Sequence, residues 1–182
     1  MAKTRIAVIV GSLRKESFNR QLADALPGLA PDVEFTRLRI DDLPLYNQDD
    51  DAAQPEPAQR LKREIAAATG LIFVTPEYNR SMPGVLKNAI DHASRPYGQS
   101  AFKGKPAGVL GVSIGAAGTA VAQQHLRNVL AYLDVPTLGQ PEVFIQAKDG
   151  VFAGPGKLGE STGKFIQGWM QTYLEFVRRH AG

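Results

Sequence analysis

Short apolar runs alternate along this chain with longer segments in which apolar residues recur every three or four positions. The short runs are typical of strands, and the longer segments are typical of helices that bury one face. The predicted strands are residues 6–10, 33–40, 71–75, 107–112 and 137–145. The predicted helices are residues 17–26, 57–68, 83–94, 119–133 and 158–179.

Five strand–helix pairs in this order predict an α/β fold in which helices cover both faces of a parallel sheet. Residues 6–10 and 71–75 are apolar at almost every position, as expected for strands covered on both sides. Five strands in 182 residues fit the flavodoxin-like strand order 2-1-3-4-5 better than a six-stranded Rossmann sheet. We therefore predict one three-layer domain over residues 1–182, with ligands beyond the carboxyl ends of the strands.

The last predicted helix has an aromatic stripe. Phe165, Trp169, Tyr173 and Phe176 are spaced three or four residues apart, which puts them on one helix face. Such a stripe is more often core packing than a cofactor site. We expect it to pack against the sheet.

Composition and charge exclude several classes of function. Hydrophobic residues make up 43% of the chain, so disorder is not expected, and the net charge is +3. The cations are scattered, which argues against a dedicated nucleic-acid binder, although a basic surface attracts phosphorylated small molecules. There is no cysteine, which excludes thiol and iron–sulfur chemistry. No apolar stretch has the length of a signal peptide or membrane span, so the cytoplasm is the expected location.

The turn after the first predicted strand is rich in groups that bind anions. Gly11 permits a tight turn, and Ser12 and Ser17 offer hydroxyl groups. Asn19 adds an amide, and Arg14 adds a guanidinium suited to a phosphate. With the N-terminus of the following helix, these groups predict a phosphomonoester site. The alternative is that Ser17 only caps the helix and the cations are solvated. Acidic residues are missing from this strand end, which excludes a phosphoacceptor receiver domain of the same fold.

The turn after the third predicted strand combines stiffness with an aromatic ring. Pro76 and Pro83 bracket the turn, and Pro83 suits the first turn of the next helix. Between them, Glu77, Tyr78 and Asn79 supply an aromatic face and hydrogen-bonding groups. A flat heteroaromatic ligand needs such a surface. The alternative is an ordinary connecting loop.

These two turns together resemble a known family. The first contains Gly-Ser-Leu-Arg-x-x-Ser-x-Asn, and the second contains Thr-Pro-Glu-Tyr-Asn-x-Ser-x-Pro-Gly-x-Leu-Lys-Asn-Ala-Ile-Asp. With Pro-Leu-Tyr-Asn at residues 44–47, they resemble the NAD(P)H-dependent FMN reductases. More narrowly, the chain resembles the bacterial quinone, chromate and azo-dye reductases of that family. The resemblance covers nearly the whole chain.

The resemblance implies where FMN binds. The first turn would hold the phosphate and the ribityl chain, the second would line the isoalloxazine ring, and Ser113 would complete the site. The implied cofactor-binding residues are Ser12, Leu13, Arg14, Lys15, Glu16, Ser17, Phe18, Asn19, Pro76, Glu77, Tyr78, Asn79, Arg80 and Ser113. Arg80 departs from the aromatic residue that is common at its place in the family.

The loop after the fourth predicted strand contains Ser-x-Gly-x-x-Gly, formed by Ser113, Gly115 and Gly118. This pattern lacks the first glycine of the dinucleotide fingerprint, and no acidic residue ends the next strand. We expect a loop of small residues that lets the flavin edge approach the backbone. Close packing of helix on sheet is the alternative.

Two arginines are candidate contacts for the reduced nicotinamide or the acceptor. Arg80 follows the aromatic turn directly, and Arg95 lies at the end of the helix that this turn begins. For Arg95 the alternative is that it only complements the helix dipole.

A metal site is not expected. His92, His125 and His180 have no Glu or second His at ligand spacing. The acidic run at residues 49–51 lies in a Pro/Gln-rich segment and is expected to be a solvated loop.

We therefore predict an FMN-dependent oxidoreductase that uses NADH or NADPH as co-substrate. The expected mechanism has two steps at one flavin face, with the nicotinamide leaving before the acceptor binds. The resemblance implies quinones as acceptors, with azo dyes, chromate or ferric chelates as further ones, and a homodimer or a tetramer of two dimers. No nucleic acid or membrane partner is expected. The alternatives are a flavodoxin-type electron carrier and a non-catalytic nucleotide-binding regulator.

Overall fold

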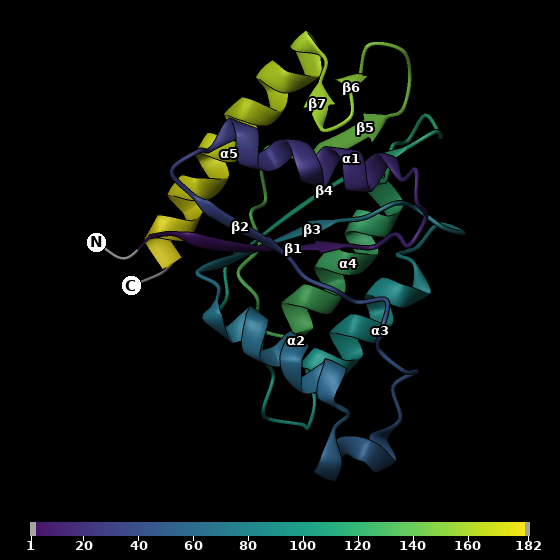
Figure 1. The fold of residues 1–182 in the computed structure, drawn as a ribbon, viewed down its shortest axis with the longest axis vertical. Helices are drawn as coiled ribbons and strands as arrows, with labels where there is room; N and C mark the ends of the chain where they lie inside the picture. Colours follow the sequence, from purple (N-terminus) through teal and green to yellow (C-terminus); the bar gives the residue numbers. More distant parts are fainter. Residues whose placement is uncertain (1–2, 181–182) are drawn as a thin grey trace.

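The computed structural model describes residues 3–180 and contains a five-stranded parallel sheet (Figure 1). Its strand order is β2-β1-β3-β4-β5. The strands are β1 (Arg5–Val10), β2 (Glu34–Arg37), β3 (Gly70–Val74), β4 (Ala107–Ser113) and β5 (Val143–Gln146). This order confirms the predicted flavodoxin-like fold, and it makes β2 and β5 the two edge strands.

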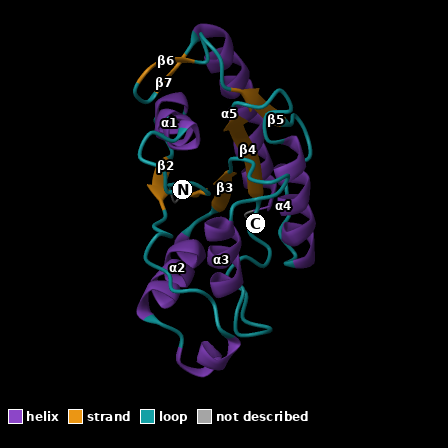
Figure 2. Cartoon of the chain, turned by 90° about the vertical axis from the view of Figure 1, so that its right-hand side faces the viewer, coloured by secondary structure: helices purple, strands orange, loops and turns teal. Residues whose placement is uncertain are grey.

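Helices cover both faces of the sheet (Figure 2). One face carries α1 (Phe18–Ala25) and α5 (Glu160–His180), and the other carries α2 (Glu56–Ala67), α3 (Gly84–Ala93) and α4 (Ala120–Tyr132). The alternation along β1 explains the two layers. Ile6 and Val8 belong to the core beneath α1 and α5, whereas Ala7 and Ile9 belong to the core beneath the other three helices.

The edge strands are shorter than predicted. Strand β2 covers four of the eight residues expected at 33–40, and β5 covers three of the nine expected at 137–145 and ends one residue later. Before β5, Thr137 forms only an isolated bridge to Ala107. Pro136 and Pro141 flank this part of the chain, and neither has an N–H group for a strand ladder.

The predicted aromatic stripe of α5 is partly wrong. Trp169 and Tyr173 are buried and stack at 5.2 Å between ring centroids, and the Tyr173 hydroxyl donates a 2.8 Å hydrogen bond to the Leu71 carbonyl. Phe165, in contrast, is 45% exposed, and Phe176 only packs at the edge of the core. The buried face of α5 is completed by three aliphatic side chains, Ile166, Met170 and Val177. Phe165 precedes Ile166 in the chain, and Phe176 precedes Val177. Each of these two aromatic side chains therefore points about 100° around the helix from a buried one.

Four short elements were not predicted. They are the 3-10 helices η1 (Leu26–Leu29) and η2 (Gln48–Ala53) and the hairpin strands β6 (Phe152–Gly154) and β7 (Lys157–Leu158). Elements of two to six residues are too short to show a periodic pattern. The acidic run lies in η2, which has no buried residue, in agreement with a solvated segment. No helix within residues 3–180 is long and apolar enough to span a membrane.

Candidate functional site

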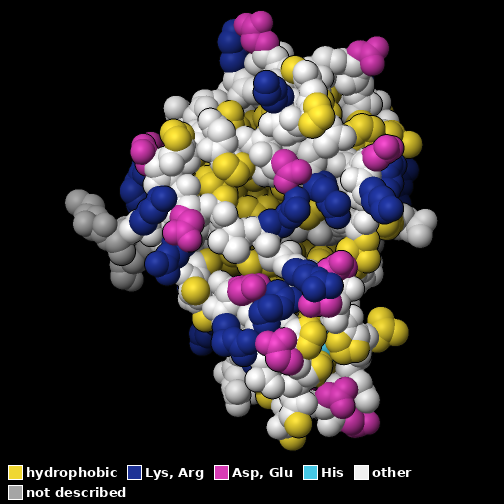
Figure 3. All heavy atoms as spheres, viewed as in Figure 1, with side chains coloured by type: hydrophobic (Ala, Val, Ile, Leu, Met, Phe, Trp, Pro, Cys, Tyr) yellow, Lys and Arg dark blue, Asp and Glu magenta, His cyan; other side chains and the backbone are white. Residues whose placement is uncertain are grey.

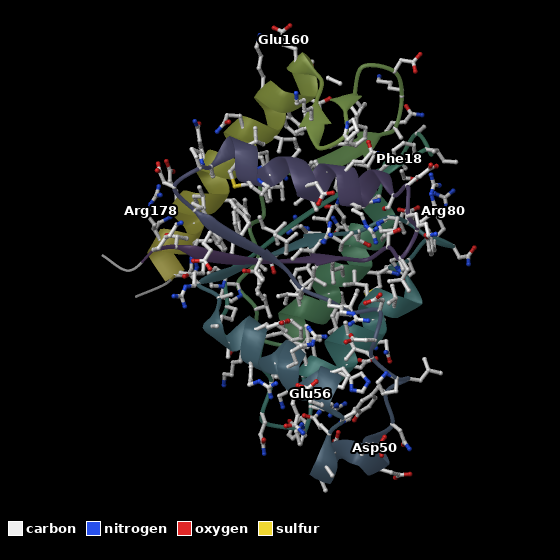
Figure 4. All side chains as sticks on the ribbon, in the orientation of Figure 1. Phe18, Asp50, Glu56, Arg80, Glu160 and Arg178 are labelled. Atoms are coloured by element: carbon white, nitrogen blue, oxygen red, sulfur yellow. The ribbon has the colours of Figure 1, made fainter. Side chains whose placement is uncertain are left out.

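Three loops meet at the carboxyl edge of the sheet. Val10 of β1 is paired with Val74 of β3, which is paired in turn with Leu110 of β4. Because these strands are parallel neighbours, the loops that follow them leave the same edge, where ligands bind in folds of this kind. Figure 4 shows Phe18 and Arg80, from two of these loops, on the same side of the molecule.

The start of α1 is arranged to bind an anion. Ser17 is the N-cap, and its hydroxyl oxygen accepts a hydrogen bond from the Arg20 N–H at 3.3 Å. The N–H groups of Phe18 and Asn19, the first two helical residues, have no hydrogen-bond partner within residues 3–180. These N–H groups and the helix dipole favour a negative charge in front of the helix. Ser17 therefore caps the helix, as the alternative required, and still leaves the anion site open.

Side chains of the same loop add further donors. Ser12 is buried after the end of β1, with 6% of the residue exposed, and its hydroxyl has no partner among residues 3–180. Arg14 donates one hydrogen bond to the Glu16 carbonyl at 2.9 Å, which leaves other guanidinium N–H groups available. Leu13 is half exposed, and Lys15 is exposed without an ion pair among the described residues.

The β6–β7 hairpin packs against the first residue of α1. The ring of Phe18 stacks on Phe152 of β6 with centroids 6.0 Å apart, and the Arg14 guanidinium lies 5.7 Å from the Phe18 ring centre. A cation over an aromatic face is attracted to it. Phe152 is thus a supporting residue that sequence analysis missed, because its strand has only three residues.

Asn19 holds the loop to the sheet rather than pointing outward. Its side-chain amide donates to the Val112 carbonyl at 2.8 Å and accepts from the Val112 N–H at 2.9 Å, and it is 2% exposed. The side chain therefore joins α1 to β4. Any contact of Asn19 with a phosphate in this arrangement would come from its backbone N–H.

The loop after β3 is a tight hairpin turn. The N–H and carbonyl groups of Tyr78 and Ser81 exchange two hydrogen bonds of 3.0 Å, and Asn79 and Arg80 have φ values of 51° and 64°. Two positive φ values at the central positions define a type I′ turn. Asn79 and Arg80 lie exposed at its tip, Tyr78 is 50% exposed, and Pro76 is buried beneath them. The turn presents an aromatic ring on a rigid base, at the same edge of the sheet as the start of α1.

Glu77 and Ser81 tie this turn to α4. One carboxylate oxygen of Glu77 accepts hydrogen bonds from the N–H groups of Val121 and Ala122, both at 3.1 Å, and the Glu77 side chain is only 10% exposed. The Ser81 hydroxyl lies 3.1 Å from Nδ1 of His125. Glu77 therefore caps α4, a helix whose own N-cap residue makes no side-chain capping bond to the backbone and whose first turn has no acidic residue.

The two glycines in the loop after β4 have different surroundings. A Cβ on Gly118, where φ is 60°, would lie 2.8 Å from the backbone of Phe144, so this glycine allows close packing against β5. A Cβ on Gly115 would meet only the Ser113 hydroxyl, at 3.6 Å. That hydroxyl accepts a 3.2 Å hydrogen bond from the Gly115 N–H. The packing alternative thus applies to Gly118, whereas Ser113 and Gly115 border the open side.

Comparison with known proteins gives the family. Residues 4–150 match the model of the NADPH-dependent FMN reductases. The chain is 54% identical over 176 residues to a 2-hydroxy-1,4-benzoquinone reductase of Burkholderia sp., covering 96% of each protein. It is 47% identical to a quinone reductase of Pseudomonas putida, covering 95% of this chain and 94% of that one. The chain belongs to the NADPH-dependent FMN reductase family.

A solved structure of a relative agrees. FerB, a flavoenzyme NAD(P)H:(acceptor) oxidoreductase from Paracoccus denitrificans, is 45% identical and superposes with a TM-score of 0.92, over 97% of this chain and 98% of that one. Membership of this FMN reductase family confirms the predicted enzyme class and its cofactors, FMN with NADH or NADPH.

The two candidate arginines of this FMN reductase lie at opposite ends of α3. Arg80 precedes the helix, whereas Arg95 follows its last turn, and a ten-residue helix rises about 15 Å. The Arg95 carbonyl accepts hydrogen bonds from Gln54 and Lys62. Within one chain, therefore, Arg80 alone of the two lies beside the three loops at the carboxyl edge of the sheet, and both side chains cannot meet one small group.

Two histidines named in the sequence analysis contact other parts of the chain. No group of three or more His, Asp or Glu side chains suited to a metal ion occurs within residues 3–180. His92 is buried, and its Nε2 lies 2.9 Å from the Pro44 carbonyl. His125 contacts the loop after β3 through Ser81, a contact that sequence analysis did not predict.

Proposed function

We propose that this FMN reductase transfers electrons from NADH or NADPH to quinones through FMN bound at the three loops. One observation supports it most. The N–H groups of Phe18 and Asn19 have no partner among residues 3–180, and the turn just before them holds unused hydroxyl and guanidinium donors. The half-exposed ring of Tyr78 lies at the same edge of the sheet. That donor set suits a phosphate dianion, and the neighbouring ring suits a flat heterocycle.

The residues have separate parts in holding FMN. Ser12, Arg14 and the N-terminus of α1 would bind the phosphate, and Tyr78 with the Ser113 loop would flank the ring. When bound, FMN supplies the hydride and electron-transfer chemistry. The protein contributes orientation, since Glu77, Ser81 and Asn19 lock the loops in place through the contacts described above.

A two-step exchange follows from this arrangement. The turn at Tyr78 and the Ser113 loop would cover one side of a bound ring, so donor and acceptor would share the other. We infer that they bind one after the other. Steady-state rates with NADH and a quinone should give parallel double-reciprocal lines, and a trapped ternary complex would contradict the shared site.

Quinones are the acceptors that the relatives support, since two of them are named for quinone reduction. Azo dyes, chromate and ferric chelates are further proposed acceptors. We also propose that residues 1–182 act as one flavin-binding domain in the cytoplasm, where reduced nicotinamides are available.

We further propose a homodimer, which could pair into a tetramer. A groove of about 530 Å³ lies between α3 and α4. Tyr97 and Tyr132 line it, and they are 81% and 76% exposed. Exposed aromatic rings of this size are typical of protein interfaces. A second copy that covers the groove would put Arg95, another lining residue, at the subunit boundary.

Anaerobic stopped-flow mixing tests the proposed reaction. The FMN-loaded protein is mixed with NADPH or NADH, and a quinone is added in a second push. We expect rapid loss of the yellow colour and its rapid return with the quinone. A flavin that stays oxidised with both nucleotides would favour an electron carrier, and a protein that binds no flavin would favour a regulator.

A further inference from the structure

Many charged side chains on the surface are paired with one another. Figure 3 shows Lys and Arg side chains gathered with acidic ones across the middle of one face, between α1 and α2. Ion pairs such as Arg37–Asp24 and Arg60–Asp42, at 2.7 and 3.0 Å, occur there. One titratable side chain beside the loop after β3 is different. His125 of α4 is exposed, and its Nε2 has no partner within residues 3–180.

The other ring nitrogen of His125 is held by the loop after β3. Nδ1 lies 3.1 Å from the Ser81 hydroxyl oxygen. Ser81 in turn exchanges two backbone hydrogen bonds of 3.0 Å with Tyr78. Residues paired in this way across a hairpin lie about 5.5 Å apart at Cα and direct their side chains to the same face. His125 is therefore attached to the face of the turn that carries the Tyr78 ring.

The α4 helix places His125 one turn beyond the cap made by Glu77. The Glu77 carboxylate accepts a hydrogen bond from the N–H of Val121. Val121 and His125 are four residues apart, so they are neighbours on one helix face. The same face continues to Val129, which lines the groove between α3 and α4. His125 thus lies on the surface between the turn after β3 and this groove, where a small acceptor can reach it.

The charged groups beside this part of α4 are engaged in contacts of their own. They are Glu77 and Arg80 of the turn, Lys87 and Asp91 of α3, Arg127 of α4, and Glu142 just before β5. Asp91 pairs with Lys87 at 2.9 Å, and Arg127 donates to the Leu138 carbonyl at 2.7 Å. None of the three carboxylates is bonded to His125. A proton on Nε2 is therefore open to a ligand rather than held by a carboxylate.

Reducing a quinone to a hydroquinone needs one proton besides a hydride. When one quinone oxygen receives the hydride, supplied through FMN from NADH or NADPH, the other oxygen becomes anionic. A positioned acid that protonates this oxygen lowers the barrier. Imidazole suits the task, because its ordinary pKa of about 6.5 lets it give and regain a proton near neutral pH.

We propose that His125 donates this proton to the quinone oxygen from Nε2. The N–H bond at Nε2 breaks, an O–H bond forms on the quinone, and the imidazolium becomes a neutral imidazole. Nδ1 keeps its hydrogen and donates it to the Ser81 hydroxyl, which leaves Nε2 free to take a new proton from water. The overall reaction consumes one reduced nicotinamide, one proton and one quinone, and it yields the oxidised nicotinamide and a hydroquinone. The proposal rests on the proposed function, because it needs a quinone at the flavin beside Tyr78.

Single-turnover oxidation gives the first test. The FMN-loaded protein is reduced with dithionite, which does not depend on nicotinamide binding, and is mixed with 1,4-benzoquinone or with ferricyanide. Ferricyanide accepts an electron without a proton. We expect His125→Gln to slow oxidation by the quinone about 10-fold, less than the usual contribution of about 10²–10⁴ from a general acid, because water reaches an exposed site. The rate constant with ferricyanide should stay within about 2-fold of wild type, because no proton is transferred.

His180→Gln is the matched control. It removes another exposed imidazole, on α5, whose Nδ1 lies 2.8 Å from the Phe176 carbonyl. Neither rate constant should change in this variant. Ser81→Ala is a second variant, which keeps the imidazole but removes the hydroxyl that orients it. It should slow the quinone reaction by a smaller factor than His125→Gln and leave the ferricyanide reaction unchanged.

The pH profile separates a proton donor from a structural residue. Only the imidazolium form can give the proton. The ratio of the wild-type rate constant to that of His125→Gln, measured with the quinone, should therefore fall as the pH rises through the range around 6.5 where an imidazole ordinarily loses its proton. A residue that only stabilises the loop would give a ratio that does not depend on pH.

NMR signals of the imidazole rings give a test that needs no turnover. Hydroquinone is added to the oxidised, FMN-loaded protein, and the His125 signals are assigned by their absence from His125→Gln. We expect these signals to shift as hydroquinone binds, while the His180 signals stay in place. This titration decides whether His125 meets the ligand even if neither nucleotide reduces the flavin, a result that would contradict the proposed function.

Three outcomes would overturn the proposal. In the first, His125→Gln and the wild type reduce the quinone at the same rate at every pH. In the second, oxidation by ferricyanide slows by the same factor as oxidation by the quinone, which would mean that His125 supports the flavin loops instead of giving a proton. In the third, saturating hydroquinone leaves the His125 signals unchanged.

Discussion

The loops after β1 and β3 leave the same edge of the sheet but differ in how their polar groups are hydrogen-bonded. The loop after β1 leaves the N–H groups of Phe18 and Asn19 without partners among the described residues, so its polarity is directed outward. The loop after β3 satisfies its own groups through the turn at Tyr78 and through the carboxylate of Glu77 on α4. The first loop is therefore suited to bind a charge, and the second is suited to present a rigid surface.

The comparison also shows how each loop is fixed. The first is held by one buried side chain, Asn19, which bonds to β4. The second is held by backbone geometry, since Asn79 and Arg80 adopt positive φ values, and by two contacts with α4. Substitutions at these positions should therefore show which residues stabilise the loops and which bind a ligand.

The largest expected effect comes from Asn19→Ala. This change leaves the buried N–H and carbonyl of Val112 unpaired, and each unpaired group costs about 1–3 kcal/mol. We expect the free energy of unfolding, measured in urea, to fall by about 2–5 kcal/mol. As a control, Gln124→Ala removes an exposed amide that bonds to Glu142 and should change stability by less than about 0.5 kcal/mol. Equal effects of the two changes would show that Asn19 does not hold the loop.

Glu77→Gln should have the next largest effect. Two charge-assisted bonds to the start of α4 become weaker, which should lower the free energy of unfolding by about 1–2 kcal/mol. Glu160→Gln is the matched control, because Glu160 also lies in the first turn of a helix, α5, but its side chain is 84% exposed. If Glu77→Gln is no more destabilising than Glu160→Gln, the cap on α4 contributes little to the second loop.

Arg14→Ala tests the outward polarity of the first loop. Losing one charge-assisted contact to a phosphate at an exposed site should weaken FMN about 10-fold. Riboflavin has no phosphate, so its affinity should stay unchanged in fluorescence titrations. An equal loss for both ligands would show that Arg14 does not contact the phosphate.

The smallest expected effect concerns the strained turn. Arg80→Gly and Arg80→Ala remove the same side chain, but glycine tolerates the positive φ that alanine does not. We expect the glycine variant to be more stable than the alanine variant by about 1 kcal/mol in thermal or urea unfolding.

Both Arg80 variants also test nicotinamide binding. If Arg80 contacts the dinucleotide, both should raise the KM for the nucleotide to a similar extent, and less so at high salt because an exposed contact is screened. Unchanged KM values at low salt in both variants would leave Arg80 with its exposed ion pair to Glu77 and no role in donor binding.

Much of the fold followed from periodicity. The apolar runs that became β1, β3 and β4 are buried on both faces, so their pattern is strong and local. The edge strands β2 and β5 have mixed patterns and were predicted too long, because an edge strand ends where pairing with its neighbour ends. The short hairpin that places Phe152 under Phe18 has no local signal of its own.

For the candidate site too, the sequence predicts some features and tertiary structure decides others. Gly11, Ser12, Arg14 and Ser17 are close together in the chain, so the sequence by itself determined that they lie in one turn before a helix, the turn proposed to bind the phosphate. It also determined the aromatic turn at residues 76–80, through proline positions and residue type. Which side chains face a ligand was decided by tertiary structure. Asn19 and Glu77 belong to the same two motifs, yet their amide and carboxylate are satisfied by β4 and α4, 93 and 44–45 residues away in the chain. Hydrogen-bond partners at such separations depend on how helices pack on the sheet, and local pattern does not specify them.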